Sequence, residues 1–273
     1  MRKELSFQEN QQQALEVLKK VADICEKKGL KYYLVYGTLI GAIRHKDFIP
    51  WDDDIDIMMP RKDYEELLNY FHDENPEGLE LFEPKTKKNY PYMIARVCDT
   101  ATYIETHNEV DCGMGVFIDI YPFDGLGNTR EEAVKFGLKG DLLSSLCYQS
   151  TRKHFEVGIT KGFLRVAFKF PLYVVAKLFG HDYWRNKLLK LEGVKAYDEN
   201  KYVGCVVWLT GGERDMFERE WFGEGIVAPF GKYEFRVPTE YDKMLRNMYG
   251  DYMQLPPESE RVGHHNYKVY YKS

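Results

Sequence analysis

Apolar positions in the first half of the chain follow two periods, one helical and one typical of extended strands. Between residues 7 and 28 apolar side chains recur every three or four positions and Gly29 ends the pattern, which predicts a helix. The segments that follow are short, apolar and bounded by glycine or proline, as strands usually are. The pattern predicts strands at 31–36, 55–58, 92–97, 102–105 and 116–120, and helices at 38–44 and 63–71. The strands at 92–97 and 102–105 are expected to form a hairpin.

Proline and glycine punctuate the rest of the chain. Pro60 and Pro122 are expected to end their strands, and Asp124 to belong to the turn after the second one. Helical spacing dominates from about 130 to 200. Beyond it, the pattern predicts strands at 202–209 and 232–238 and a helix at 240–249 that Gly250 ends. The chain is therefore expected to be α+β, with a catalytic core at 1–129, a helical insertion at 130–200 and a return to the core at 201–273.

Composition narrows the class of protein. Of the 273 residues 44% are hydrophobic, so a packed core is expected. The net charge of −5 gives no basic footprint for nucleic acid. Five cysteines without a C-x-x-C pair predict reduced thiols. With a polar N-terminal segment and no clean apolar span, the sequence predicts a cytoplasmic protein.

Four aspartates crowd the stretch "PWDDDIDIMMP". Charge runs usually face water, but this one is fenced by Trp51, Ile57 and other apolar residues. A calcium loop that starts at Asp52 would need Gly at its sixth position and Glu at its twelfth, where Ile57 and Asp63 stand, so that interpretation fails.

A divalent-cation site explains the cluster better. On one strand, Asp54 and Asp56 would point to the same face with Cα atoms ~6.5–7 Å apart. Carboxylate oxygens are the ligands that Mg²⁺ prefers, and bound Mg²⁺ keeps positions open for water and phosphate. Asp119, in the apolar strand "VFIDIYPFD", is the candidate third carboxylate, with a salt-bridged core aspartate as the alternative.

Phosphate-binding candidates lie close to these acids. Gly37 and Thr38 follow a strand and open a short helix, where backbone N–H groups can face an anion. Arg44 and Lys46 could neutralise phosphate, and Arg96 stands among apolar strand residues where an anion partner is expected. A plain turn and surface charges remain the alternatives for the first four residues.

Taken together, "GAIRHKDFIPWDDDIDIMMPRKDYEEL", "FIDIYPFD" and "YDKMLRNMYGDYMQLPP" resemble the LicD family of phosphocholine transferases, which is similar to the fukutin-type sugar-phosphate transferases. The resemblance covers nearly the whole chain. It implies a nucleotidyltransferase-like fold, a small mixed sheet flanked by helices. Residue by residue it implies a turn at Gly37-Thr38, a D-x-D pair at Asp54 and Asp56, and a third acid at Asp119.

The resemblance also implies a reaction. A CDP-activated alcohol such as CDP-choline would donate its alcohol phosphate to a sugar hydroxyl of a surface glycan, with Mg²⁺ or Mn²⁺ as cofactor. A choline group needs aromatic faces. The aromatic candidates are Trp51, Tyr121, Phe123 and Trp208. His265 could reach the substrate or lie on the surface.

Residues 161–180, "KGFLRVAFKFPLYVVAKLFG", combine basic and apolar side chains at helical spacing. A basic amphipathic helix of this kind can lie at a membrane interface, where a lipid-linked glycan would be met. A helix packed on the catalytic core is the alternative. Two other functions stay open, a nucleotidyltransferase that leaves the nucleotide on its product and a glycan-binding module without catalysis.

Overall fold

A computed structural model describes residues 3–87, 90–155, 163–208, 211–263 and 268–272, and at 163–168 it describes the backbone alone. The helices are α1 (Phe7–Lys28), α2 (Tyr36–Ile40), α3 (Arg61–Glu74), α4 (Arg130–Thr151), α5 (Phe163–Phe179), α6 (His181–Leu189) and α7 (Tyr241–Tyr249). The strands are β1 (Tyr33–Leu34), β2 (Asp56–Pro60), β3 (Leu79–Phe82), β4 (Ala95–Asp99), β5 (Thr102–Glu105), β6 (Phe117–Gly127), β7 (Tyr202–Gly204), β8 (Phe217–Glu218), β9 (Ile226–Phe230), β10 (Tyr233–Val237) and β11 (Lys268–Tyr271).

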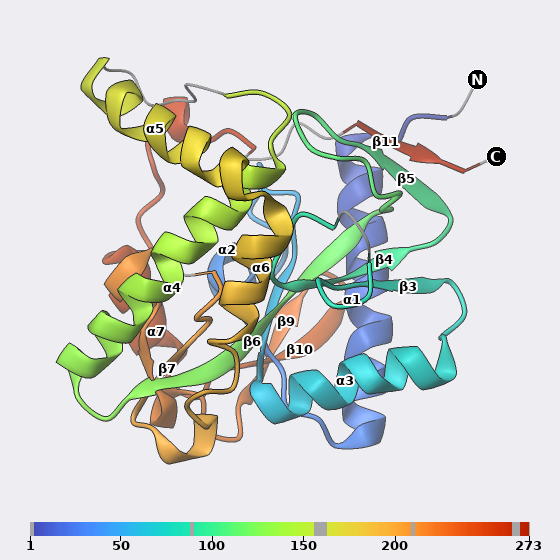
Figure 1. The fold of residues 1–273 in the computed structure, drawn as a ribbon. Coiled ribbons are helices and arrows are strands. Elements are labelled where there is room, and N and C mark those ends of the chain that lie inside the picture. The colour runs from blue at the N-terminus through green and yellow to red at the C-terminus, as the bar shows by residue number, and fades with distance from the viewer. Residues whose placement is uncertain (1–2, 88–89, 156–162, 209–210, 264–267, 273) are drawn as a thin grey trace.

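A mixed sheet forms the centre of the molecule, with helices packed around it (Figure 1). Its strands run in the order β1–β2–β6–β4–β3, and β7 and β8 continue it along the second half of β6. The pair β2–β6 is parallel, whereas β4 and β7 are antiparallel to β6. This is the α+β, nucleotidyltransferase-like arrangement that the sequence predicts.

The first helix forms where its pattern predicts it. Ser6 and Glu9 make reciprocal side-chain to backbone bonds at its start, and Gly29 ends it in the left-handed conformation at φ 70°. The apolar positions of the pattern are the buried ones. At the other end of the chain, β11 pairs with β5, and Tyr270 of β11 forms an antiparallel bridge with Glu4, so the two terminal segments lie side by side (Figure 1).

The predicted hairpin is wrong, although both of its strands exist. Instead of pairing with each other, β4 pairs with β3 and β6, and β5 pairs with β11. A local pattern shows that a segment is extended, but its partners depend on which neighbours complete the buried sheet. β3, β8, β9 and β11 were not predicted.

Pro60 ends its strand as predicted, but Pro122 does not. Pro60 is the last residue of β2, and β6 runs through Pro122 to Gly127. The pairing with β4 stops at Ile120, so the missing N–H of Pro122 falls where that edge of β6 has no partner. Asp124 is consequently a fully buried strand residue, and its assignment to a turn is wrong.

Two other strands are shorter than predicted. The strand expected at 31–36 is only Tyr33–Leu34, because the chain already enters α2 at Tyr36. The strand expected at 202–209 is only Tyr202–Gly204 among the described residues.

The helical pattern at 130–200 is confirmed as α4, α5 and α6, and α4 packs against β6. Over the described part of the chain, none of the helices combines the length and apolar character needed to cross a membrane.

Candidate active site

The parallel pairing of β2 with β6 brings two of the predicted acids together. Asp56 is the register partner of Asp119, and the Asp119 N–H donates to the carbonyl of Ile55 at 2.8 Å. Asp54 lies two residues before β2 begins its ladder, in the segment that leads into the strand. Adjacent strands lie ~4.8 Å apart, so Asp56 and Asp119 occupy neighbouring backbone positions near the start of the two parallel strands.

Asp56 has the least compensated charge of the three. It is 6% exposed, and its Oδ1 has no hydrogen-bond partner among the described residues. Burial raises the pKa of its carboxyl well above the ordinary value, and the charges of Asp54, Asp119 and Asp52 raise it further. The Tyr121 hydroxyl lowers this pKa, in the opposite direction. A bound cation would relieve the repulsion and satisfy the open oxygen.

Asp119 is held differently. The Arg96 guanidinium donates to both of its oxygens, from Nε at 2.6 Å and from Nη2 at 3.3 Å. The guanidinium also lies against two rings, 3.6 Å from the centroid of Tyr92 and 3.9 Å from that of Phe117. Arg96 was predicted to bind phosphate, but in the structure its guanidinium makes a bidentate interaction with the carboxylate of Asp119. A carboxylate has about four acceptor positions, so Asp119 keeps room for a further ligand.

The predicted phosphate turn packs closely against the acids. A Cβ on Gly37 would lie 2.5 Å from an oxygen of Asp52, so a larger residue here would displace that carboxylate. The Thr38 hydroxyl accepts a hydrogen bond from the backbone N–H of Asp56 at 2.9 Å. Because a carboxylate lies against the turn, an anion bound there would need a cation beside it. α2 itself is only five residues long.

The remaining candidates from the sequence lie in different surroundings, and Arg44 and Trp51 have partners within the protein. Arg44 donates to the carbonyl of Tyr252 at 2.5 Å, and so ties the loop after α2 to the segment after α7. Lys46 is exposed in the left-handed conformation at φ 61°. The half-buried Trp51 has the guanidinium of Arg261 over its ring at 5.6 Å. His265 lies outside the described residues.

Tyr121 meets the expectation of an aromatic group beside the acids. It is 6% exposed, and its ring contacts that of Tyr36 edge-on, at 5.1 Å between centroids. Phe123, by contrast, is buried in the core against Phe217 and Phe222. Trp208 packs against other rings.

Sequence patterns did not identify three residues beside the acids, namely Tyr36, Asp215 and Tyr249. Tyr36 has φ 52°, an uncommon conformation for a bulky residue, and its buried hydroxyl has no hydrogen-bond partner in the described chain. Asp215 and Tyr249 reach the site from the last third of the chain. The Tyr-Gly pair at the change from strand to helix was the one local signal available, since backbone strain often marks functional sites.

The acids do not form a finished metal cage. Within the described residues, no three His, Cys, Asp or Glu side chains are placed so that they could hold a metal ion together. The donor chemistry nevertheless fits a hard cation, because Asp56 has a buried oxygen without a partner in the described chain and the nearby charges of Asp54 and Asp119 raise its pKa. Asp53 and Asp54 also line a small cavity of about 10 Å³ beside Asn10, which is the size of a single water.

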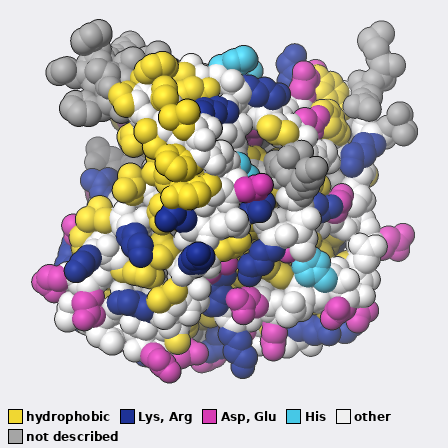
Figure 2. All heavy atoms as spheres, in the orientation of Figure 1, with side chains coloured by type: hydrophobic (Ala, Val, Ile, Leu, Met, Phe, Trp, Pro, Cys, Tyr) yellow, Lys and Arg dark blue, Asp and Glu magenta, His cyan; other side chains and the backbone are white. Residues whose placement is uncertain are grey.

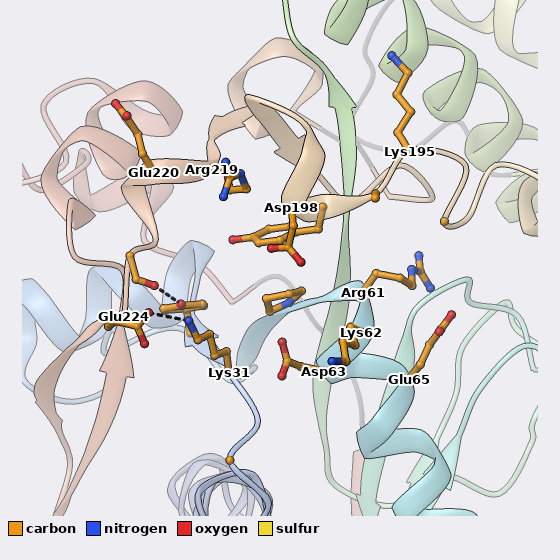
Figure 3. Close-up of a pocket in the computed structure, with 17 residues that line it drawn as sticks. Lys31, Arg61, Lys62, Asp63, Glu65, Lys195, Asp198, Arg219, Glu220 and Glu224 are labelled. Carbon is orange, nitrogen blue, oxygen red and sulfur yellow. Dashed lines mark hydrogen bonds and ion pairs between the residues drawn. The ribbon is translucent and has the colours of Figure 1, made fainter.

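A much larger cavity lies elsewhere. It has a volume of about 780 Å³ and lies beyond the far end of β2, between the start of α3 and the segments 193–198 and 219–224 (Figure 3). Its walls carry balanced charges, including the ion pair of Lys31 with Glu224 at 2.8 Å. β2 separates this cavity from Asp56 by about four residues, or ~13 Å along the strand.

Comparison with known proteins identifies the family. The model described as "LicD/FKTN/FKRP, nucleotidyltransferase domain" matches residues 29–142, which include β2 and β6. The lipopolysaccharide cholinephosphotransferase LicD of Haemophilus influenzae is 30% identical over 98% of this chain and 99% of its own length. The chain belongs to the LicD family.

Other relatives match shorter parts of the chain. The ribitol 5-phosphate transferase FKRP of Homo sapiens is 45% identical over 42 residues, which are 15% of this chain and 8% of FKRP. An uncharacterized protein of Rickettsia typhi is 30% identical over 113 residues, 40% of this chain and 33% of its own. As a member of the LicD family, the chain is assigned to the phosphotransferases.

Proposed function

We propose that the chain transfers phosphocholine, or a similar alcohol phosphate, from a CDP-activated donor to a sugar hydroxyl. The acceptor would be a cell-surface glycan such as a teichoic acid, lipooligosaccharide or capsule precursor. The observation that carries the proposal is the full-length match to a lipopolysaccharide cholinephosphotransferase. The buried, uncompensated carboxyl of Asp56 beside Asp54 and Asp119 supplies the chemistry.

In this proposal Asp54, Asp56 and Asp119 hold Mg²⁺ or Mn²⁺. When bound, the ion would neutralise the donor pyrophosphate and stabilise the entering and departing oxygens. The acceptor oxygen attacks the β-phosphorus, the bond from that phosphorus to the CMP oxygen breaks, and CMP leaves with the electron pair. A nearby carboxylate takes the proton of the hydroxyl. Arg96 orients Asp119, and Thr38 fixes the backbone of Asp56.

A donor screen tests the proposal. The protein is incubated with Mg²⁺ and CDP-choline, CDP-ethanolamine, CDP-glycerol or CDP-ribitol, with and without deacylated lipooligosaccharide, and the nucleotide products are separated. We expect CMP from at least one donor and loss of its release in EDTA. Pyrophosphate release from CTP would favour a nucleotidyltransferase instead. An absence of products with every donor and acceptor would contradict both.

We also propose that the enzyme works in the cytoplasm at the inner face of the cell membrane, on a lipid-linked acceptor. Hydrophobic side chains gather over α4 and α5 (Figure 2). We name this surface the α4–α5 face; its exposed apolar residues are Leu138, Leu142, Phe170, Leu172, Val174, Val175, Leu178 and Phe179. Leu178 is 78% exposed and Leu138 60% exposed, which is unusual for leucine in a water-facing helix. Exposed lysines, among them Lys135, Lys139 and Lys177, accompany the face and suit an anionic lipid surface.

Vesicle flotation tests this part separately. The protein is mixed with vesicles of phosphatidylglycerol and phosphatidylcholine, or of phosphatidylcholine alone. We expect binding to the anionic vesicles and its loss in the double variant Leu138→Glu, Leu178→Glu. The matched control is Val194→Glu, a residue that is 60% exposed away from this face. Equal flotation of the double variant and the wild type would contradict the membrane role of the α4–α5 face.

A further inference from the structure

A cluster of three tyrosines and one aspartate, most of it buried, lies beside the acids of the candidate active site. Tyr36 begins α2, Tyr121 belongs to β6, Tyr249 ends α7, and Asp215 ends a short 3₁₀ helix at 212–215. The rings of Tyr36 and Tyr121 meet edge-on at an interplanar angle of 73°. α7 packs against both α2 and the 3₁₀ helix, so four distant parts of the chain meet here.

Asp215 is a buried carboxylate without a cationic partner. It is 5% exposed, and in the described part of the chain no Lys or Arg forms an ion pair with it. Its Oδ2 accepts a hydrogen bond from the backbone N–H of Gly211 at 2.6 Å. A Cβ on Gly211 would lie 2.5 Å from the other oxygen, so the turn is built to approach this carboxylate closely. Burial raises its pKa to about 6, and the bond from Gly211 lowers it.

Tyr249 joins this carboxylate to the acids of the active site. The residue is 46% exposed, so part of its ring faces solvent. Burial of its hydroxyl end raises the pKa of Tyr249, and the carboxylates of Asp56 and Asp215 raise it further. Asn247, two residues earlier, donates to the carbonyl of Arg214 at 2.8 Å, which fixes the end of α7 beside Asp215. Tyr249 is therefore partly accessible to solvent, and its hydroxyl end lies near the carboxylates of Asp56 and Asp215.

This combination selects a particular ligand chemistry. A quaternary ammonium group cannot donate hydrogen bonds, so proteins bind it with aromatic faces and a nearby negative charge. Mg²⁺ is instead a hard cation that needs oxygen ligands and retains water. The two kinds of cation would occupy adjacent parts of the site, joined by the donor phosphates, with the oxygen ligands at Asp54 and Asp56 and the rings at Tyr36 and Tyr249.

We propose that Tyr36, Tyr121, Tyr249 and Asp215 form the subsite for the quaternary ammonium group of the donor alcohol. We call them the tyrosine–aspartate subsite, and the inference rests on the proposed function. Asp215 supplies the charge that a neutral alcohol would leave uncompensated, and the tyrosines supply the faces. The subsite thus makes the enzyme prefer choline to glycerol or ribitol as the donor alcohol.

Isothermal titration calorimetry tests the subsite without catalysis. The probes are choline and 3,3-dimethyl-1-butanol, an uncharged molecule of nearly the same shape, each titrated in the presence of CMP and Mg²⁺. We expect the wild type to bind choline at least about tenfold more tightly than the uncharged analogue. Asp215→Asn and Tyr249→Leu should each reduce the affinity for choline at least about tenfold, so that choline and the uncharged analogue bind with similar affinity.

Matched controls separate the subsite from general effects. Tyr183→Leu removes a tyrosine that is 40% exposed on α6, and Asp99→Asn neutralises another aspartate that is 5% exposed. Both should keep the preference for choline, and circular dichroism should show that every variant is folded. Equal affinity of the wild type for both probes, or unchanged choline binding in Asp215→Asn and Tyr249→Leu, would overturn the inference. If no CDP donor is turned over, the proposed function fails, and the choline titrations still decide whether the subsite binds an organic cation.

Discussion

Asp124 and Asp56 are buried aspartates on neighbouring strands, but their carboxylates differ in how far hydrogen bonds and cations compensate their charge. Asp124 on β6 is 0% exposed and accepts hydrogen bonds from Arg61 at 2.8 and 2.6 Å, with a third from the N–H of Gly193 at 3.1 Å. Asp56 on β2 is 6% exposed, has an oxygen without a partner in the described chain, and has further acids as its neighbours.

This difference in charge compensation indicates which carboxylate stabilises the fold and which is a candidate for binding a ligand. A buried carboxylate that is fully hydrogen-bonded and ion-paired holds elements together, and here it joins β6 to the start of α3. A buried carboxylate surrounded by others is costly to the free protein, and a ligand can recover that cost. Asp119 is intermediate, because Arg96 compensates its charge while its register partner is Asp56.

The largest effect is expected for Asp56→Asn. Because this variant removes one charge from the cation site and keeps the shape of the side chain, CMP release should fall below detection. The unfolding free energy should stay unchanged or rise, because a repulsive buried charge is lost. Turnover from the preferred CDP donor and urea unfolding are measured on the same preparation. Turnover close to that of the wild type would contradict the role of Asp56.

Asp124→Ala should show the reverse pattern. The change leaves the Arg61 guanidinium buried with only Glu192 near it, at 3.7 Å from Nη1. Breaking a buried pair in this way costs about 3–5 kcal/mol of unfolding free energy. The measurement is urea unfolding followed by circular dichroism. A loss under about 1 kcal/mol would show that the pair is not the structural link described here.

Asp215→Asn should have a smaller, pH-dependent effect. The folded protein holds the Asp215 proton up to about pH 6, whereas an unfolded Asp releases it near pH ~3.9. The charged form therefore opposes folding, and its contribution to stability falls as the pH rises from about 4 to about 6. At pH 7.5 the variant should be more stable than the wild type by on the order of 1–2 kcal/mol.

That advantage should disappear toward pH 4, where the wild-type carboxyl is protonated as well. Urea unfolding of both proteins at pH 4, 5, 6 and 7.5 gives the comparison. A variant that is no more stable at pH 7.5, or a difference that does not change with pH, would show that Asp215 carries no uncompensated charge.

The sequence predicted that Asp56 and Asp119 come together, but not how their charges are compensated. Period-two spacing placed Asp54 and Asp56 together, and similar apolar surroundings singled out Asp119. The bond between Arg96 and Asp119 depends on β4 pairing with β6, which no local pattern encodes. For the same reason Asp124 was taken for a turn residue.

The partners from the end of the chain were beyond sequence reasoning for a related cause. Asp215 and Tyr249 reach the site because α7 packs against α2 and against the 3₁₀ helix at 212–215. Their contacts span more than half of the chain, and helix packing of this kind depends on the whole core. The helix of α7 was predicted at nearly its observed bounds, but not the surface it would meet.

Calorimetry of magnesium binding shows whether Asp54 and Asp56 hold a divalent cation. The wild type, Asp54→Asn, Asp56→Asn and the control Asp63→Asn are each titrated with Mg²⁺ in the presence of CMP. Asp63 is half-buried at the far end of β2 and lines the other cavity. We expect saturable Mg²⁺ binding to the wild type and to the control Asp63→Asn, and loss of this binding in Asp54→Asn and Asp56→Asn. The same binding curve for all four proteins would contradict it.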